Sequence, residues 1–159
     1  MQYAELESFT KGDGKDTSYV NRTNAEGWVI ENGRCDEQAD FGVEADQIIL
    51  NGKKTAIGKI TSTVISGGVS KVSFNYGYAF SESGKVKATI NIKDAEGNIV
   101  ATTTLEASGV EKFAVCEFVW ELETVVEGDF VLEIVNGCPS NSTSNKDRLS
   151  IWNLGWLAA

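Results

Sequence analysis

In the stretch Val72-Ser73-Phe74-Asn75-Tyr76-Gly77-Tyr78-Ala79-Phe80, large apolar or aromatic residues at even positions alternate with small or polar residues at odd positions. Successive side chains of a β-strand point to opposite faces, so this period of two predicts a strand with one buried face. The segment 86–93 has the same alternation, with aliphatic residues at its even positions and polar or charged residues between them. The two segments therefore indicate strands rather than helices.

Turn sequences separate the other short apolar runs. Asn51-Gly52, Ser66-Gly67-Gly68 and the segment 94–98 are typical of turns between strands, and the chain holds 16 Gly but a single Pro. Short strands at nearly regular spacing, about eight to ten of them, are typical of a two-layer β fold. We therefore predict an all-β protein, an antiparallel two-sheet β-sandwich with jelly-roll connections.

The composition narrows the possible functions. The net charge of −9, from 23 acidic and 14 basic residues, disfavours nucleic acid as a partner, because binding to phosphates relies on Lys and Arg. The chain has no His, which excludes Ser–His and zinc–His chemistries. No apolar run reaches the roughly 18 to 20 residues that a membrane-spanning helix requires.

The length of the chain fits a single domain over residues 1–159. The N-terminus lacks the basic and apolar regions of a signal peptide. Because Met1 is the only Met, we expect it to be a start codon placed on a module excised from a larger secreted protein.

Three Cys residues leave the redox compartment open. The segments 113–123 and 130–136 predict a hairpin, and its continuation places Cys116 opposite Cys138. A disulfide there would imply an oxidising compartment. Cys35 with Cys138 is another possible bridge, and three buried reduced thiols are an equally compatible alternative.

The chain contains three distinctive segments, which are Gly67-Gly68-Val69-Ser70-Lys71-Val72-Ser73-Phe74-Asn75-Tyr76, the loop ending Ser144-Asn145-Lys146-Asp147-Arg148, and the closing Leu149-Ser150-Ile151-Trp152-Asn153-Leu154-Gly155-Trp156. Together they resemble accessory β-sandwich modules of secreted multidomain bacterial enzymes and lipoproteins, and the jelly-roll carbohydrate-binding modules. The likeness covers about residues 17 to 157.

The resemblance implies a galactose-binding-like jelly roll in a secreted or cell-surface location, extracellular or periplasmic. It also implies a polysaccharide or oligosaccharide ligand, an attached catalytic domain in the parent protein, and a structural calcium ion near the chain termini. Related closing strands often carry an Asp pair where this chain has Trp152-Asn153. We therefore do not expect a calcium ligand from this strand.

Sugars present apolar faces ringed by hydroxyl groups, so proteins recognise them with a flat aromatic ring surrounded by a few polar groups. Trp28, on a short strand beside loops, is the best single candidate for such a ring. The candidate ligand-binding residues are Trp28, Tyr76, Tyr78, Asn145, Lys146, Arg148 and Trp152.

Each of these candidates has a structural alternative. The aromatic residues at 76 and 78 can instead line the interior, as we expect for Trp120, which shares a face with Leu122. Asp147 and Arg148 can form an ion pair that fixes the loop to the sheet.

Calcium requires six to eight oxygen ligands, and carboxylates are concentrated in the irregular N-terminal quarter of the chain. The candidate metal ligands are Glu5, Glu7, Asp13 and Asp16. A solvated acidic surface is the alternative, because an excess of carboxylates produces one without any metal.

These observations predict a non-catalytic carbohydrate-binding module that targets an attached enzyme to a polysaccharide through aromatic platforms and polar loop residues. The alternative is a structural or protein-interaction module with no glycan ligand. A third reading, a small hydrolase, would require two carboxylates about 5 to 10 Å apart across a cleft, and no pair stands out in the sequence. We therefore do not expect an enzyme.

Overall fold

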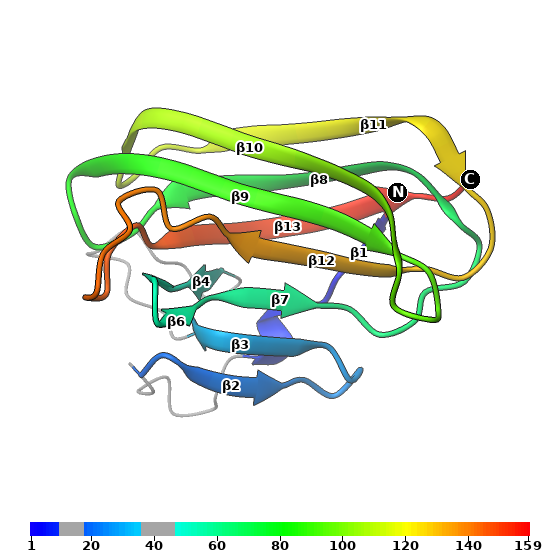
Figure 1. Ribbon diagram of the computed structural model, residues 1–159, viewed down its shortest axis with the longest axis horizontal. Helices are drawn as coiled ribbons and strands as arrows, with labels where there is room; N and C mark the ends of the chain where they lie inside the picture. The colour runs from blue at the N-terminus through cyan, green and yellow to red at the C-terminus, as the bar shows by residue number, and fades with distance from the viewer. Residues whose placement is uncertain (10–17, 36–46) are drawn as a thin grey trace.

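The computed structural model describes residues 1–9, 18–35 and 47–159, which form β-strands and one short 3-10 helix (Figure 1). All strand pairs within these ranges are antiparallel. In chain order the elements are β1 (Gln2–Tyr3), η1 (Leu6–Phe9), β2 (Val20–Thr23), β3 (Val29–Arg34), β4 (Ile48–Leu50), β5 (Gly52–Lys53), β6 (Ala56–Ile57), β7 (Lys59–Thr61), β8 (Val69–Tyr78), β9 (Ser83–Lys93), β10 (Ile99–Glu111), β11 (Cys116–Val126), β12 (Val131–Asn136) and β13 (Leu149–Leu157). The predicted all-β antiparallel fold is therefore confirmed.

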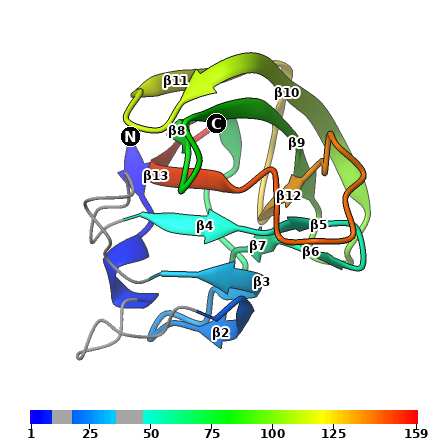
Figure 2. The same ribbon diagram turned by 90° about the vertical axis from the view of Figure 1, so that its left-hand side faces the viewer.

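One continuous sheet folds over to form both layers of the sandwich. Its strand order is β10-β9-β12-β7-β3-β4-β13-β8-β11, with β1 paired to β13 and β2 paired to β3. The strand β3 joins the layers, because residues 29–31 pair with β7 and residues 33–34 pair with β4. Between these parts Asn32 has a φ of 51°, a left-handed conformation that interrupts the regular strand. In Figure 2, β10 and β11 lie together at the top of the molecule, and β2 and β3 lie at the bottom.

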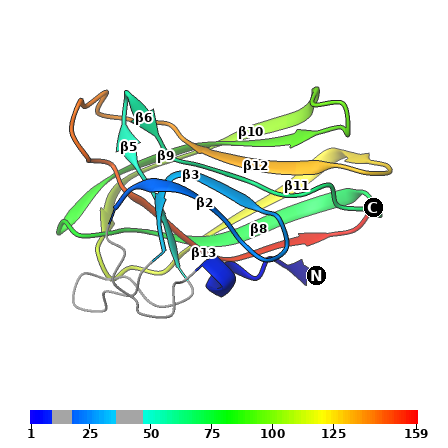
Figure 3. The same ribbon diagram turned by 90° about the horizontal axis from the view of Figure 1, so that it is seen from below.

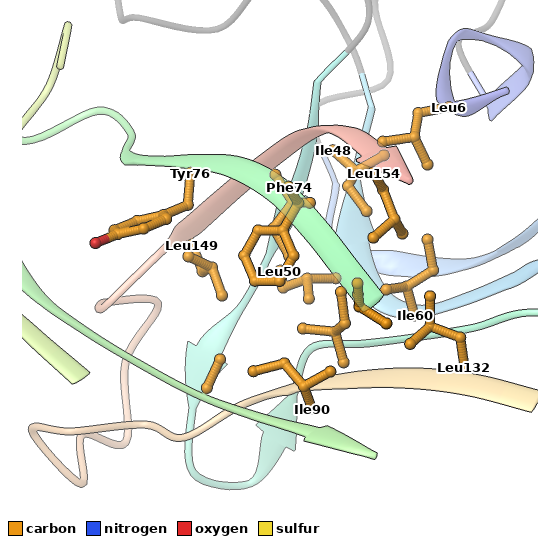
Figure 4. Packing of buried hydrophobic residues seen from close by; sticks show 14 of the residues in the cluster. Leu6, Ile48, Leu50, Ile60, Phe74, Tyr76, Ile90, Leu132, Leu149 and Leu154 are labelled. Carbon is orange, nitrogen blue, oxygen red and sulfur yellow. The ribbon is translucent and has the colours of Figure 1, made fainter. Parts of the chain in front are cut away.

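The core lies between the two layers. Phe74 of β8, 1% exposed, stacks on Phe118 with ring centroids 4.9 Å apart, and the ring of Tyr76 packs edge-on against it at 6.4 Å. Figure 4 shows Phe74 among aliphatic side chains from β4, β9, β12 and β13. Burial of each large apolar side chain contributes about 1.5 to 3 kcal/mol, which makes this layer of contacts the main stabilising element.

The hairpin predicted across the segment 94–98 is confirmed. β9 and β10 pair from Lys93 opposite Ile99 to Ser83 opposite Glu111. In the turn, Asp94 Oδ1 accepts hydrogen bonds from the backbone N–H groups of Glu96 and Asn98, each at 2.9 Å. The hydrogen bonds from Asn98 are the largest cause of a lowered pKa for Asp94.

The hairpin predicted between segments 113–123 and 130–136 is wrong. β11 pairs with β8, whereas β12 pairs with β7 and β9, so the two strands belong to opposite layers. The alternation in each segment correctly predicts an apolar face that points into the core. It does not show which strand is the neighbour in the sheet. Residues 127–130 thus cross from one layer to the other.

The proposed pairing of Cys116 with Cys138 depended on that hairpin. No disulfide joins Cys35, Cys116 and Cys138 in the structure. The Cys35 thiol donates to Phe9 O at 2.7 Å, and the Cys138 thiol donates to Gly52 O at 2.6 Å. The sequence left open a disulfide or three reduced thiols, and the structure shows the reduced thiols.

The two chain termini lie at the same end of the sandwich, where β1 pairs with β13 (Figures 1 and 3). The small hairpin of β5 and β6 and the loop 137–148 lie at the opposite end. Within the described residues, no helix has the length and apolar character needed to cross a membrane.

A buried carboxylate lies on the outward side of β12. Glu133, 6% exposed, accepts hydrogen bonds from Asn91 Nδ2 at 3.0 Å and Lys93 Nζ at 2.8 Å, and Lys59 Nζ lies 3.8 Å away. Burial by itself raises the pKa of Glu133, but the hydrogen bonds from Lys93 and Asn91 and the charges of Lys93 and Lys59 together lower it. This network links β7, β9 and β12.

We expect Glu133→Gln to lower the free energy of unfolding at pH 7 by about 1 to 3 kcal/mol, because charge-assisted hydrogen bonds are lost. A folded-state pKa below the unfolded one means that the stabilisation is present above the ordinary Glu pKa and is lost as pH falls through the folded-state pKa. Urea unfolding of both proteins across the acid range measures this. Glu106→Gln, at an exposed position on β10, is the control. A difference between Glu133→Gln and the unmodified protein that persists in acid would contradict the assignment.

Candidate functional site

Trp28, the best candidate ring, is buried, so its prediction as an exposed platform is wrong. It is 3% exposed and stacks on Trp156 with centroids 6.0 Å apart and planes inclined by 30°. The turn before β3 holds it there, because Asn24 Oδ1 accepts hydrogen bonds from the backbone N–H groups of Glu26 at 3.1 Å and Trp28 at 2.9 Å. Trp28 shares its strand face with the fully buried Ile30, a period-two signal that the sequence already contained.

Tyr76 and Tyr78 also belong to the core, as the alternative reading expected. Each is 8% exposed, and burial is the largest cause of a raised pKa for both. In Figure 4 the Tyr76 ring lies at the edge of the core with its hydroxyl pointing away from the other side chains. Neither ring offers an open face to a sugar.

Trp152 faces outward because a β-bulge changes the parity of β13. The register with β8 shifts between Trp152 and Gly155, and Asn153 in this interval has a φ of 53°. Leu149 and Ile151 therefore point inward before the bulge, and Leu154 and Trp156 point inward after it. A regular alternation would place Trp152 and Trp156 on one face, and the sequence contains no sign of the extra residue.

The half-buried indole of Trp152 lies over Gly77, with a small hollow of about 110 Å³ beside it. Phe113, 66% exposed, and Val115, 72% exposed, line the same hollow, together with the side chains of Gln47 and Ser150. Trp152 is thus an accessible ring with apolar and amide neighbours.

Arg148 immediately precedes β13 and lies four residues before Trp152, about 13 Å away at the spacing of a strand. It lines a larger pocket of about 460 Å³, which we call the loop pocket. The loop pocket is formed by segments before β2, at the end of β3, around β5 and β6, and before β13. Its lining residues are Ser18, Tyr19, Arg34, Asn51, Lys53, Ala56, Asn145 and Arg148. Two predicted ligand-binding residues, Asn145 and Arg148, are therefore brought together.

Two guanidinium groups beside this pocket contact the same aromatic ring. Arg34 lies 4.5 Å and Arg148 5.1 Å from the centroid of the Phe80 ring. Phe80 has a φ of 73°, which turns it out of the core pattern of β8 and onto a separate cluster with Ile49 and Ala79. A bulky residue with positive φ is strained, and such strain is concentrated at functional sites.

Three buried polar atoms around the loop pocket have no hydrogen-bond partner. They are the Tyr19 hydroxyl, Asn51 Oδ1 and Arg148 Nε, and they are the full set of such side-chain atoms in the described ranges. Burial is the largest cause of a raised pKa for Tyr19, and the charges of Arg148 and Arg34 partly oppose it. An unpartnered buried polar atom costs about 1 to 3 kcal/mol, so the pocket holds polar groups that a ligand can satisfy.

The loop that carries Arg148 is fixed by its own hydrogen bonds. The Asp147 carboxylate accepts hydrogen bonds from Ser140 N at 2.9 Å and Ser140 Oγ at 2.8 Å. Asn136 Nδ2 donates to Leu50 O at 3.0 Å and Asp147 O at 2.7 Å. No ion pair joins Asp147 to Arg148, so the expected ion pair between these two residues is wrong. Arg148 instead lines the loop pocket.

Asn145 and Lys146 lie next to each other at the rim. Both are exposed, and Asn145 Oδ1 accepts a hydrogen bond from Asn51 Nδ2 at 2.9 Å. Lys146 does not line the loop pocket, but its backbone packs on β5. A Cβ at Gly52 would lie 2.0 Å from Lys146 O, so the close approach requires glycine at that position.

A third surface lies between the edge strands β10 and β11. It is a groove of about 510 Å³ lined by Thr102 and Thr103 on one side and by Trp120 and Leu122 on the other. Trp120 packs against the core but is only partly buried, because β11 is an edge strand. This groove contains none of the unpartnered polar atoms.

The calcium prediction stays a prediction. Asp13 and Asp16 lie outside the described residues, as does the side chain of Glu7, and Glu5 is exposed. Within the described part of the chain, no group of three or more Asp, Glu, His or Cys side chains could hold a metal ion.

Sequence reasoning missed Tyr19, Arg34, Asn51 and Lys53. Asn51-Gly52 was interpreted only as a turn, and Asn51 contacts Asn145 across 94 positions of sequence. Tyr19 and Arg34 lie on two further segments. Local periodicity does not connect such distant segments, so no pattern of residues signals their assembly.

No protein-family model matches the sequence, and no curated protein sequence matches it. Solved structures do match. The family 11 carbohydrate-binding module of a cellulosomal cellulase of Clostridium thermocellum has a TM-score of 0.52 and 8% identity, covering 100% of this chain and 96% of that chain. A family 4 carbohydrate-binding module has a TM-score of 0.51 and 11% identity, covering 96% of this chain and 100% of that one.

An arabinose-bound α-L-arabinofuranosidase has a TM-score of 0.55 and 9% identity over 93% of this chain, and the chain spans only 28% of that enzyme. At these identities the similarity shows the fold alone. The chain has the β-sandwich fold of carbohydrate-binding modules, as the resemblance of its sequence implied.

The burial of the indoles predicts their response to a quencher. We expect iodide to quench the half-buried Trp120 and Trp152 but not Trp28, 3% exposed, or Trp156, 7% exposed. The double variant Trp120→Phe, Trp152→Phe should therefore keep a blue-shifted emission that iodide hardly reduces. Strong quenching of the double variant would contradict the burial of Trp28 and Trp156, and guanidinium-unfolded protein gives the reference for full exposure.

Proposed function

We propose that the protein is a non-catalytic carbohydrate-binding module whose ligand binds on the outward side of β13. The observation that carries the proposal is the gathering of the unpartnered Tyr19 hydroxyl, Asn51 Oδ1 and Arg148 Nε around one pocket. A sugar hydroxyl both donates and accepts hydrogen bonds, so a glycan supplies partners for a mixed set of this kind.

The geometry of the outward side supports an extended ligand. The loop pocket provides polar groups, and the accessible ring of Trp152 on β13 lies about 13 Å from Arg148 at the spacing of a strand. Stacking of a sugar on an indole and hydrogen bonding at a neighbouring polar site are complementary forms of recognition. Asn145 at the rim adds an amide to this arrangement.

The proposal of a binding role rather than an enzyme is supported by the chemistry of the pocket. None of the described residues that line the loop pocket is Asp or Glu. Glycoside hydrolysis uses an acid with a raised pKa and a second carboxylate. The well-buried Glu133 has a lowered pKa, and it lies in a network with two lysines.

Attachment to a catalytic domain and a secreted or cell-surface location complete the proposal. The likeness to part of an arabinofuranosidase supports the first. In such an arrangement the module would raise the effective concentration of the attached enzyme at its polymer.

A protein-interaction module is the second candidate. The exposed Phe113 and Val115 beside Trp152 form an apolar patch that favours it. Under this alternative the patch binds a neighbouring domain, and the loop pocket has no glycan ligand.

We expect Asn145→Ala and Trp152→Ala each to weaken glycan binding by about fivefold to tenfold, because each removes one polar or stacking contact. Affinity electrophoresis in gels that contain plant, algal or host polysaccharides identifies a ligand, and calorimetry measures the dissociation constants. Thr104→Ala, at an exposed position on β10 outside these surfaces, is the matched control. Absence of retention on every glycan would favour the protein-interaction alternative.

A further inference from the structure

We propose that the loop pocket is selective for acidic sugars, with a carboxylate or sulfate group of the glycan bound at Arg148 and a sugar hydroxyl bound at Asn51. This inference rests on the proposed function and specifies the class of ligand.

The charge of the pocket is opposite to that of the whole protein. The net charge of the chain is −9, yet Arg34, Lys53 and Arg148 line the loop pocket, and its described lining contains no carboxylate. The nearest acidic side chain of the loop, Asp147, is 5% exposed and is hydrogen-bonded to Ser140. A local cationic site within an acidic surface favours an anionic group at that site alone.

The hydrogen-bonding groups define two kinds of partner. Arg148 Nε is a donor and needs an acceptor, whereas Asn51 Oδ1 is an acceptor and needs a donor, because Asn51 Nδ2 already binds Asn145. Simple anions satisfy only the first requirement, and neutral sugars bring no anionic group to Lys53 and Arg148. A sugar that carries a carboxylate or a sulfate ester meets both requirements.

The guanidinium of Arg148 is held in place before any ligand binds. It lies 5.1 Å from the centroid of the Phe80 ring, which also packs against Arg34 at 4.5 Å. Packing of this kind fixes the planar donor fork, so little side-chain entropy is lost when an anion binds. Phe80, with a φ of 73°, and Asp147, with a φ of 50°, have left-handed backbone conformations. These conformations direct the Phe80 ring and the loop that carries Arg148.

Tyr19 completes the pocket as a neutral hydroxyl. Burial raises its pKa, and the two guanidinium groups only partly oppose this effect, so the phenol stays protonated near neutral pH. A protonated phenol both donates to an anionic oxygen and accepts from a sugar hydroxyl. It therefore suits the same ligand.

The test compares acidic polymers with their neutral counterparts. Polygalacturonate and its fully methyl-esterified form differ in carboxylate charge, and κ-carrageenan and its chemically desulfated form differ in sulfate. We expect the protein to bind at least one acidic form about tenfold or more tightly than its neutral counterpart, since hydrogen bonds to charged groups are worth more than neutral ones. The preferred acidic polymer identifies the carboxylate or the sulfate as the recognised group.

Arg148→Gln should remove this preference, and Arg148→Lys should remove most of it, because Lys keeps the charge but lacks the planar fork. Lys71→Gln removes a positive charge at the opposite end of β8 and is the matched control. Lys53→Gln is a second pocket variant with a smaller expected loss, and it serves if the Arg148 variants fail to fold. Circular dichroism and thermal unfolding establish that each variant is folded.

The outcomes separate the two proposals. Equal binding of acidic and neutral forms, or equal losses in Arg148→Gln and Lys71→Gln, would overturn the acidic-sugar inference and leave the glycan-binding proposal intact. Failure to bind any glycan would remove both. A preference that Arg148→Gln abolishes and Lys71→Gln retains supports both.

Discussion

The direction in which each strand turns its side chains is the constraint on which this structure depends. In β8 the alternation holds from Val72 to Tyr78, so Val72, Phe74, Tyr76 and Tyr78 all reach the core. In β13 one extra residue at Asn153 reverses it, so Leu149 and Ile151 face the core before the bulge, and Leu154 and Trp156 face it afterwards. Whether a side chain lies at the surface or in the core thus depends on its odd or even position along the strand. A single β-bulge is enough to move an indole from one face of the strand to the other.

The sequence predicts the strands and turns correctly wherever a signal within a few neighbouring residues determines the local structure. The alternation of β8 and the turn between β9 and β10 are complete within a few residues, and both are found as expected. Strand pairing was predicted less well, because β11 and β12 each have an inward apolar face that fits more than one neighbour. The polar flanks of Trp28 suggest an exposed ring, whereas its shared parity with Ile30 indicates the buried position that the structure shows.

The candidate site was only half visible in the sequence. Asn145 and Arg148 lie in one polar loop, and a long polar loop on a rigid scaffold is a recognised place for binding residues. Their partners Tyr19, Arg34 and Asn51 come from segments that approach the loop only after the sheet has folded over. The cationic character of the pocket likewise depends on the orientation of Asp147 toward Ser140, which no pattern of residue types encodes.

The position of the two termini has a practical consequence for any fused or immobilised form of the protein. Both ends lie beside β1 and the end of β13, and the nine residues of β13 alone extend about 30 Å from there toward the loop pocket. A tag or linker joined at either terminus would attach the molecule at the end of the sandwich that lies farthest from the loop pocket. The loop pocket would then be presented to the medium, so surface-coupled sensors and fluorescent probes can be built without obstructing it.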